Sequence, residues 1–266
     1  MFRDPLSHKG DNGKVAIIGG SLHQHGAPIL SALAAEKSGV DLLYVFVPHC
    51  HTEVAKVASL NFQVYEFGNE KSDEFTADDV SMITEFLATM DCAVIGPGLS
   101  RTQSNQKMIK QLIAQAPCPL VCDASALQSW TMRTVSGRRA VVTPHLGELE
   151  RMGIVPESIG DSAQDHHIVI HLKAATDRIA DTSGEIIEVS GGNAGLTHGG
   201  TGDSLAGLIA GLIAQKVEPA NACAMAATII KRVGSQLSAT HGYAYTAYDV
   251  INCIPALLHS LPQALS

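Results

Sequence analysis

Basic residues are scarce in this sequence and lie scattered along it. Lys and Arg number 18 against 26 Asp and Glu, which gives a formal net charge of −8 at pH 7. A nucleic-acid-binding protein carries a basic patch or stripe, and the short arginine pair Arg138 and Arg139 falls in a predicted turn. We therefore expect no nucleic-acid partner.

Long apolar segments are also missing. Residues 1–13 contain no apolar core of a secretory signal. The longest apolar run, residues 205–214, is shorter than the roughly 20 residues that cross a bilayer. We therefore expect a cytoplasmic protein with no membrane partner.

A disulfide framework and a metal-binding pattern are absent as well. The cysteines follow no recognisable spacing, and without a signal peptide we expect free thiols. Cys118 and Cys122 would lie about 13 Å apart on one face of a strand, too far for one metal ion. We expect His49 and His51 to be ordinary loop residues and predict no metal ligands. The cysteines are Cys50, Cys92, Cys118, Cys122, Cys223 and Cys253.

Apolar runs of strand length recur along the chain. They are continuous rather than alternating, which is typical of strands buried on both faces, as in a parallel sheet covered by helices. The 45% hydrophobic content of the 266 residues is enough for a large core. The predicted strands are residues 15–20, 42–48, 92–98, 119–124, 140–144 and 168–172.

Helical patterns lie between and after these strands, and the alternation predicts a doubly wound α/β layer. Residues 176–192 depart from it and predict an antiparallel hairpin around a turn at residues 182–184. With no linker, repeat or low-complexity tract, we expect residues 1–266 to form a single domain. The predicted helices are residues 27–39, 78–90, 104–115, 204–215, 221–238 and 247–261.

Glycine and polar residues follow several predicted strands. In open α/β sheets, ligands bind beyond the carboxyl ends of the strands, so we expect a binding site at that edge. The residues concerned are Gly19, Gly20, Gly96, Gly98, Asp123, Thr143 and Lys173.

The stretch "GGTGD", residues 199–203, precedes a helix of small and aliphatic residues. Glycines let backbone approach a ligand closely, and a helix N-terminus offers free N–H groups to phosphate. Asp203 either caps this helix or takes a proton from a hydroxyl that attacks phosphorus. No Gly-Lys-Ser/Thr follows, so the loop is not a P-loop. We expect the small residues of the helix to pack closely on the sheet: Ala206, Gly207, Ala210 and Gly211.

Further segments accompany this loop: "HKGDNGKVAIIGGS" (8–21), "GAPILSALAAEKSG" (26–39), "VIGPGLS" (94–100), "VCDASAL" (121–127), "VVTPHLGELERM" (141–152) and "NAGLTHGGTGD" (193–203). Taken in this order, they resemble the ADP- or ATP-dependent NAD(P)H-hydrate dehydratases of the ribokinase-like superfamily over nearly the whole chain. The resemblance implies a three-layer α/β fold, with a mostly parallel central sheet covered by helices on both faces.

The resemblance also implies an activity, namely the repair of NADH or NADPH that has been hydrated on the nicotinamide ring. The ring hydroxyl is phosphorylated by ADP or ATP, and phosphate is then eliminated; Mg²⁺ is expected to offset phosphate charge. A homotetramer is expected, and any epimerase that interconverts the hydrates is expected on a separate chain. The sequence chooses neither ADP over ATP nor NADH hydrate over NADPH hydrate.

The resemblance also implies roles for individual residues. Asp203 matches the catalytic base, and Ala27, Gly98 and His145 match residues that contact the hydrated substrate. The residues expected at the nucleotide are Lys173, Ala174, Ala175, Thr176, Asp177, Asn193, Gly200, Thr201 and Gly202. Four others either reach the site or are structural: Lys9, Asp11, Asp123 and Glu148.

The nucleotide side departs from similar chains, which usually read Lys-Gly-x-x-Thr where this chain has "KAATD", residues 173–177. If the replaced glycine has positive φ, Ala174 costs about 1 kcal/mol or more, and Asp177 adds a carboxylate near phosphates. His198 also takes a small position, where it either pairs with phosphate or fills space. Two alternatives therefore stay open: a ribokinase-like kinase of a small-molecule alcohol, and a nucleotide-binding protein with weak turnover.

Overall fold

A computed structural model describes residues 3–260, in which the strands form one nine-stranded sheet. The strand order is β3-β2-β1-β4-β5-β6-β7-β8-β9, parallel from β3 through β7 and antiparallel at β8 and β9. The bounds are β1 (Lys14–Ile18), β2 (Leu42–Pro48), β3 (Phe62–Phe67), β4 (Cys92–Ile95), β5 (Leu120–Cys122), β6 (Ala140–Val142), β7 (Val169–Leu172), β8 (Asp177–Ala180) and β9 (Ile186–Val189).

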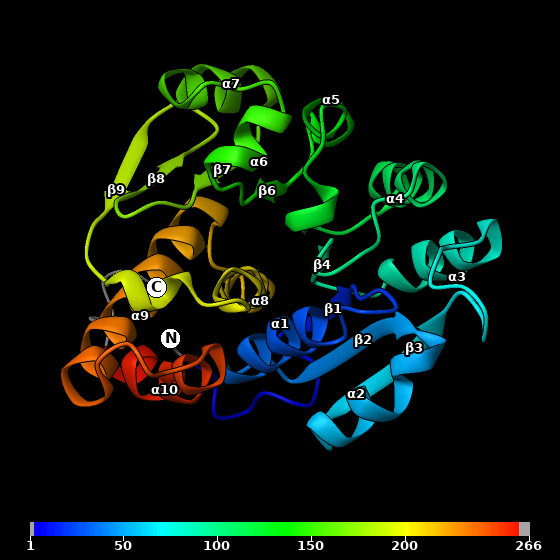
Figure 1. The fold of residues 1–266 in the computed structure, drawn as a ribbon, viewed down its shortest axis with the longest axis horizontal. Helices are drawn as coiled ribbons and strands as arrows, with labels where there is room; N and C mark the ends of the chain where they lie inside the picture. Colours follow the sequence, from blue (N-terminus) through cyan, green and yellow to red (C-terminus); the bar gives the residue numbers. More distant parts are fainter. Residues whose placement is uncertain (1–2, 261–266) are drawn as a thin grey trace.

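Helices cover both faces of this sheet (Figure 1). One face packs against α1 (Gly26–Lys37), α2 (Thr52–Ala58), α8 (Thr201–Ala214), α9 (Pro219–His241) and α10 (Ala247–Ser260). The other packs against α3 (Ala77–Leu87), α4 (Gln103–Gln115), α5 (Thr131–Val135), α6 (Leu146–Arg151) and α7 (Ile159–His166). Short 3₁₀ turns are η1 (His49–His51), η2 (Ala124–Ala126), η3 (Pro156–Ser158) and η4 (Ala194–Thr197). The predicted three-layer α/β fold is thus confirmed.

The continuous apolar strands explain these layers. Side chains alternate across a strand, so in β1 Val15 and Ile17 enter one core cluster while Ala16 and Ile18 enter the other. All four are fully buried. A strand with two buried faces needs a helical layer on each side, as the structure has.

Most predicted elements lie where the sequence placed them, including the β8–β9 hairpin. The prediction missed β3, which lies at one edge of the sheet and has four residues of its six outside the core. Its polar residues break the apolar run on which the strand predictions depended. Residue 261 of the last predicted helix lies outside the described residues.

The packing of α8 differs in one respect from the expectation. A Cβ on Gly207 would lie 1.9 Å from the carbonyl oxygen of Ser31, and one on Gly211 would lie 2.1 Å from Ser38 Oγ. Both serines belong to α1 or its C-terminal cap. The glycines of α8 therefore permit close approach to helix α1 rather than to the sheet, because a side chain there would hold the two backbones apart.

Within residues 3–260, no helix combines the length and the apolar character needed to cross a membrane.

Candidate active site

A cavity of about 720 Å³ lies beyond the carboxyl ends of β6 and β7, against the N-terminus of α8 and the side of α9. This volume is within the range of small-molecule sites, about 300–1,000 Å³. Many predicted site residues line it together, although they come from distant parts of the chain: His145, Lys173, Ala174, Ala175, Asp177, Asn193, Thr201 and Gly202.

The phosphate-loop prediction falls at the start of α8. Gly200 is the N-cap residue with φ +94°, and a Cβ on it would lie 2.4 Å from Leu30 Cδ1. Glycine is therefore required there by conformation and by space. Within the described residues, the N–H groups of Gly200 and Gly202 donate no hydrogen bond, whereas Thr201 N–H donates to His198 O at 3.3 Å. Free N–H groups thus remain at the positive end of the helix dipole.

Asp203 lies in the first turn of α8 but does not cap it. Its carboxylate has no hydrogen-bonding partner among the described residues, and burial together with the negative charge of Asp123 raises its pKa to about 7. Lys173 opposes this rise, and Glu148 adds to it. A carboxyl group with a pKa near neutral and no structural partner is suited to accept a proton.

Lys173 is the cation nearest to this carboxyl group. Its Nζ lies 2.7 Å from Asp123 Oδ1 and 3.7 Å from Glu148 Oε2. A Cβ on Gly202 would lie 3.4 Å from the same Nζ, so the ammonium is next to the first turn of α8. Burial disfavours the charged lysine, but the two carboxylates together raise its pKa above the ordinary value. Lys173 is therefore a fixed positive charge between α8 and the strand ends.

Three elements place this cluster. Asp123 follows β5 and accepts a 2.8 Å hydrogen bond from Thr143 Oγ1, Lys173 follows β7, and Glu148 lies in α6. Asp123 and Glu148, whose roles the sequence left open, are only 2% and 4% exposed. Both belong to the site because the ammonium that they hold is directed at the phosphate loop.

His145 is the N-cap of α6. Its Nδ1 accepts hydrogen bonds from the N–H groups of Gly147 and Glu148 at 3.1 and 3.3 Å. In the neutral ring the proton therefore resides on Nε2. The ring is exposed at the cavity, so it offers an N–H donor to a ligand.

Ala27 and Gly98, predicted to bind substrate, are neighbours in the structure. A Cβ on Gly98, where φ is +69°, would lie 3.1 Å from Ala27 Cβ. Ala27 is one helical turn from Leu30, which contacts Gly200. These two residues are therefore linked to the phosphate loop through Leu30, although neither lines the 720 Å³ cavity.

The turn of residues 173–177 bears on two expectations, namely strain at Ala174 and repulsion of phosphates by Asp177. Ala174 does not have positive φ, since the non-glycine residues with that conformation are Ala124, His167 and Lys216; the alanine is not strained. Asp177 Oδ1 accepts a hydrogen bond from Ala174 N–H at 3.0 Å and lies 3.2 Å from Lys231 Nζ. Its charge is compensated within the protein, so the expected repulsion of phosphates does not arise.

Other residues near the cavity are engaged by the protein. Asn193 donates from Nδ2 to Gly234 O at 2.7 Å, and its Oδ1 accepts from Gly195 N–H and from the Tyr245 hydroxyl, each at 2.8 Å. Two further side chains bond in the same way: the Thr176 hydroxyl with that of Ser190, and His198 Nδ1 with Gly195 O. The polar groups named here are therefore bonded within the protein.

The "HKGD" segment does not reach this site. It precedes β1, and a Cβ on the adjoining Gly13 would lie 3.0 Å from Ala214 at the far end of α8. Ala214 is about 17 Å along the helix from Asp203. The Asp11 carboxylate accepts the N–H of His8 at 2.7 Å, and both Lys9 and Asp11 are exposed. Their role is therefore structural.

The residues present do not form a metal cage. Within the described chain there is no group of three or more His, Cys, Asp or Glu side chains that could hold an ion. His49 bonds to Glu66, and His51 to the Ser21 carbonyl. In the site itself, Lys173 is held by Asp123 and Glu148.

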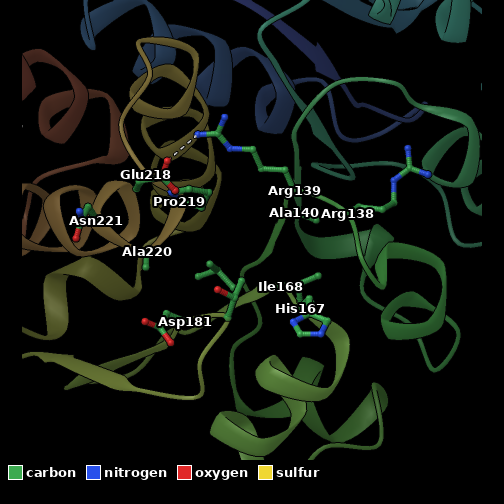
Figure 2. Close-up of a pocket in the computed structure, with 12 residues that line it drawn as sticks. Arg138, Arg139, Ala140, His167, Ile168, Asp181, Glu218, Pro219, Ala220 and Asn221 are labelled. Atoms are coloured by element: carbon green, nitrogen blue, oxygen red, sulfur yellow. Dashed lines mark ion pairs between the residues drawn. The ribbon is translucent and has the colours of Figure 1, made fainter.

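A second cavity, of about 360 Å³, lies at the opposite ends of β6 and β7 (Figure 2). Its exposed Arg139 pairs with Glu218 at 3.6 Å, and Arg138 points away to donate to the Ala114 and Ala116 carbonyls. No predicted site residue lines it.

The sequence reasoning missed Lys231. This lysine lies in α9 yet is only 7% exposed, and it reaches the turn of residues 173–177. A signal was available, since a lone lysine follows an apolar stretch in "ATIIK".

Fold and site together define an α/β protein that handles a phosphate group, with an unpartnered, partly buried acid beside free backbone N–H groups. The sequence model of the NAD(P)H-hydrate dehydratase family matches residues 15–256. The chain therefore belongs to the NAD(P)H-hydrate dehydratase family, as the motifs predicted.

Individual relatives agree. An ADP-dependent (S)-NAD(P)H-hydrate dehydratase of Cenarchaeum symbiosum is 34% identical, over 95% of this chain and 90% of its own. A bifunctional NAD(P)H-hydrate repair enzyme of Methanocaldococcus jannaschii is 36% identical, over 96% of this chain and 50% of its own; the chain spans about half of that relative. An ADP/ATP-dependent NAD(P)H-hydrate dehydratase of Bacillus subtilis, co-crystallised with ATP and Mg²⁺, superposes with a TM-score of 0.79 at 26% identity, over 97% and 93% of the chains.

Proposed function

We propose that this chain restores NADH or NADPH from the hydrated forms, with ADP or ATP as phosphoryl donor, in the cavity beside Asp203. The observation that carries the proposal is Asp203 itself: a partly buried carboxyl group with a pKa of about 7, no hydrogen-bonding partner in the described chain, and free N–H groups beside it.

Asp203 takes the proton of the ring hydroxyl. Near pH 7 about half of the carboxyl groups are ionised, so the base is available and the proton that it gains is held. The hydroxyl oxygen then bonds to the terminal phosphorus, and the bond between this phosphorus and the nucleotide breaks. AMP leaves when the donor is ADP, and ADP leaves when it is ATP.

The transferring phosphoryl group is stabilised by preorganised charge. The N–H groups of Gly200 and Gly202 point from the helix terminus, and Lys173 adds a cation beside them. Fixed donors of this kind are usually a large part of catalysis. Because the protein supplies no metal cage in its described part, we propose that Mg²⁺ enters with the nucleotide phosphates and offsets their charge.

Elimination follows from ordinary leaving-group chemistry. Hydroxide leaves poorly and phosphate leaves well. The carbon–oxygen bond breaks with its electrons on the phosphate, the ring nitrogen donates its lone pair, and a proton leaves the adjacent ring carbon. The double bond of the dihydronicotinamide is thereby restored.

Turnover with hydrated NADH or NADPH and each nucleotide in turn tests the proposal. Recovery of the absorbance of the reduced nicotinamide is expected for wild type and not for Asp203→Asn. Asp181→Asn is the control, because that aspartate is half-buried and bonds only within its own turn. A stable phosphorylated product without recovered absorbance would establish an alcohol kinase instead. Nucleotide binding without either product would establish a binding protein.

We also propose that residues 1–266 act as one domain, in the cytoplasm, and assemble as a tetramer, which rests on the family resemblance. Light scattering after size-exclusion chromatography tests the assembly. A monomer would refute the tetramer and leave the chemistry at Asp203 untouched.

A further inference from the structure

The turn between β7 and β8 carries backbone into the cavity. It consists of residues 173–176, with Asp177 opening β8. Ala174 and Ala175 are exposed and line the cavity, and neither has a side chain that could hydrogen-bond. Whatever Ala174 and Ala175 offer to a ligand must therefore come from their peptide groups.

Lys231 reaches this turn from the middle of α9. Its Nζ donates to Ala174 O at 3.0 Å and to Ala175 O at 2.9 Å, and it lies 3.2 Å from Asp177 Oδ1. Two of the three donors of the ammonium group bond to carbonyls of the turn, and its charge is paired with Asp177. Lys231 is thus directed at the turn and is not itself a ligand group.

The two carbonyl contacts fix the direction of two N–H groups. In a trans peptide, the C=O of one residue and the N–H of the next point in opposite directions. Because Lys231 holds the carbonyls of Ala174 and Ala175, the N–H groups of Ala175 and Thr176 point away from it. Neither donates a hydrogen bond within the part of the chain that the structure describes.

Asp177 closes the turn from the other side. It accepts the N–H of Ala174, and its Oδ2 lies 2.9 Å from Nε2 of His171, which is fully buried. Asp177 and Lys231 are 6% and 7% exposed. The cluster of Lys231, Asp177 and His171 therefore sets both ends of a turn whose free donors face outward.

We propose that Lys231 and Asp177 are positioning residues for nucleotide binding, which hold the N–H groups of Ala175 and Thr176 as donors to the phosphate oxygens of an adenine nucleotide. This inference rests on the proposed function only in naming the ligand. The pair acts through the turn and does not touch the hydroxyl that Asp203 deprotonates. A buried ion pair kept for stability alone would not place both of the lysine's hydrogen bonds on carbonyls of a cavity wall.

The test is the substitution Lys231→Met, which keeps the apolar stem and removes the donors. Titration calorimetry with ADP or ATP in the presence of Mg²⁺ measures the Kd directly. We expect it to rise about tenfold, as the loss of a charge-assisted hydrogen bond would produce. The kcat at saturating nucleotide should stay within about twofold, since transition-state contacts at Asp203 are unchanged.

The matched control is Lys216→Met. Lys216 also forms an ion pair, 2.6 Å from Asp91, but it is exposed and lies beyond the far end of α8. Its Kd for nucleotide should equal that of wild type. Should Lys231→Met fail to fold, Asp177→Asn replaces it, because the amide keeps the shape and an acceptor for Ala174 while the charge that Lys231 holds is lost.

The outcomes separate the two proposals. A folded Lys231→Met, or a folded Asp177→Asn, with unchanged Kd would overturn the positioning role and leave the dehydratase function standing. A weaker Kd together with a kcat reduced to the same extent would also overturn it, because the effect would then reach the chemistry. No nucleotide binding by wild type would overturn both.

Discussion

Replacing Asp203 by Asn should stabilise the protein while it abolishes activity. In the fold the pKa of this carboxyl group is about 7, against an ordinary value of 3.8. The difference of about 3 units, at 1.36 kcal/mol each, means that the ionised group costs the folded state about 4 kcal/mol at most. The cost arises because burial and the charge of Asp123 disfavour the carboxylate.

The sign of the effect depends on pH. Below pH 3.8 the carboxyl group is protonated in the folded and the unfolded chain, so Asn and Asp should be equally stable. Between pH 3.8 and 7 the unfolded chain ionises first, and wild type loses stability as the pH rises. Above pH 7 the advantage of Asp203→Asn should be complete.

Urea unfolding of wild type and Asp203→Asn at pH 4 and pH 8 measures this difference. Asp181→Asn is the control: hydrogen bonds from Ser183 lower the pKa of Asp181, so its substitution should not stabilise at pH 8. Equal stability of wild type and Asp203→Asn at pH 8 would refute the partly buried, unpartnered carboxylate on which the proposed base depends.

Two further predictions follow from the same geometry. The kcat/KM of wild type should fall about tenfold per pH unit below a midpoint near 7. Glu148→Gln should move this midpoint to lower pH, since Glu148 raises the pKa of Asp203. A midpoint that does not move would contradict this effect of Glu148. Gly207→Ala should lower the free energy of unfolding by about 3 kcal/mol, because its Cβ would meet Ser31 O. The control Gly26→Ala should not lower it, because nothing lies within 4 Å of a Cβ there. Equal unfolding curves for the two variants would refute the close helix contact.

The buried strands β1, β2, β4, β5, β6 and β7 could be predicted because each is a continuous apolar run, whereas the short helices α2, α5, α6 and α7 were missed. β2 was predicted with the bounds that the structure gives it, Leu42–Pro48. β3 was missed because it lies at the edge of the sheet, where polar residues such as Gln63 and Glu66 are exposed and interrupt the apolar run. Periodicity alone does not separate such a segment from a loop.

The candidate site could be predicted as a list of residues but not as a set of contacts. The motifs identified Asp203 and Lys173, and the resemblance that they carried gave the family. They did not indicate that Lys173 pairs with Asp123 and Glu148, because these residues meet only when β5, β6 and β7 end at one edge. The family motif at residues 173–177 likewise made Asp177 look unfavourable, since its partner Lys231 is distant in sequence.

The contact of α8 with α1 has a consequence for how the two substrates meet. α8 carries Asp203, α1 carries Ala27, and backbone lies against backbone where Gly207 faces Ser31, while Gly211 faces the short side chain of Ser38. Because no side chain separates Gly207 from the Ser31 backbone, the two helices are expected to move as one rigid unit. The distance between donor phosphorus and acceptor oxygen is then fixed by these two helices. Any opening or closing of the site must occur in the loops around it.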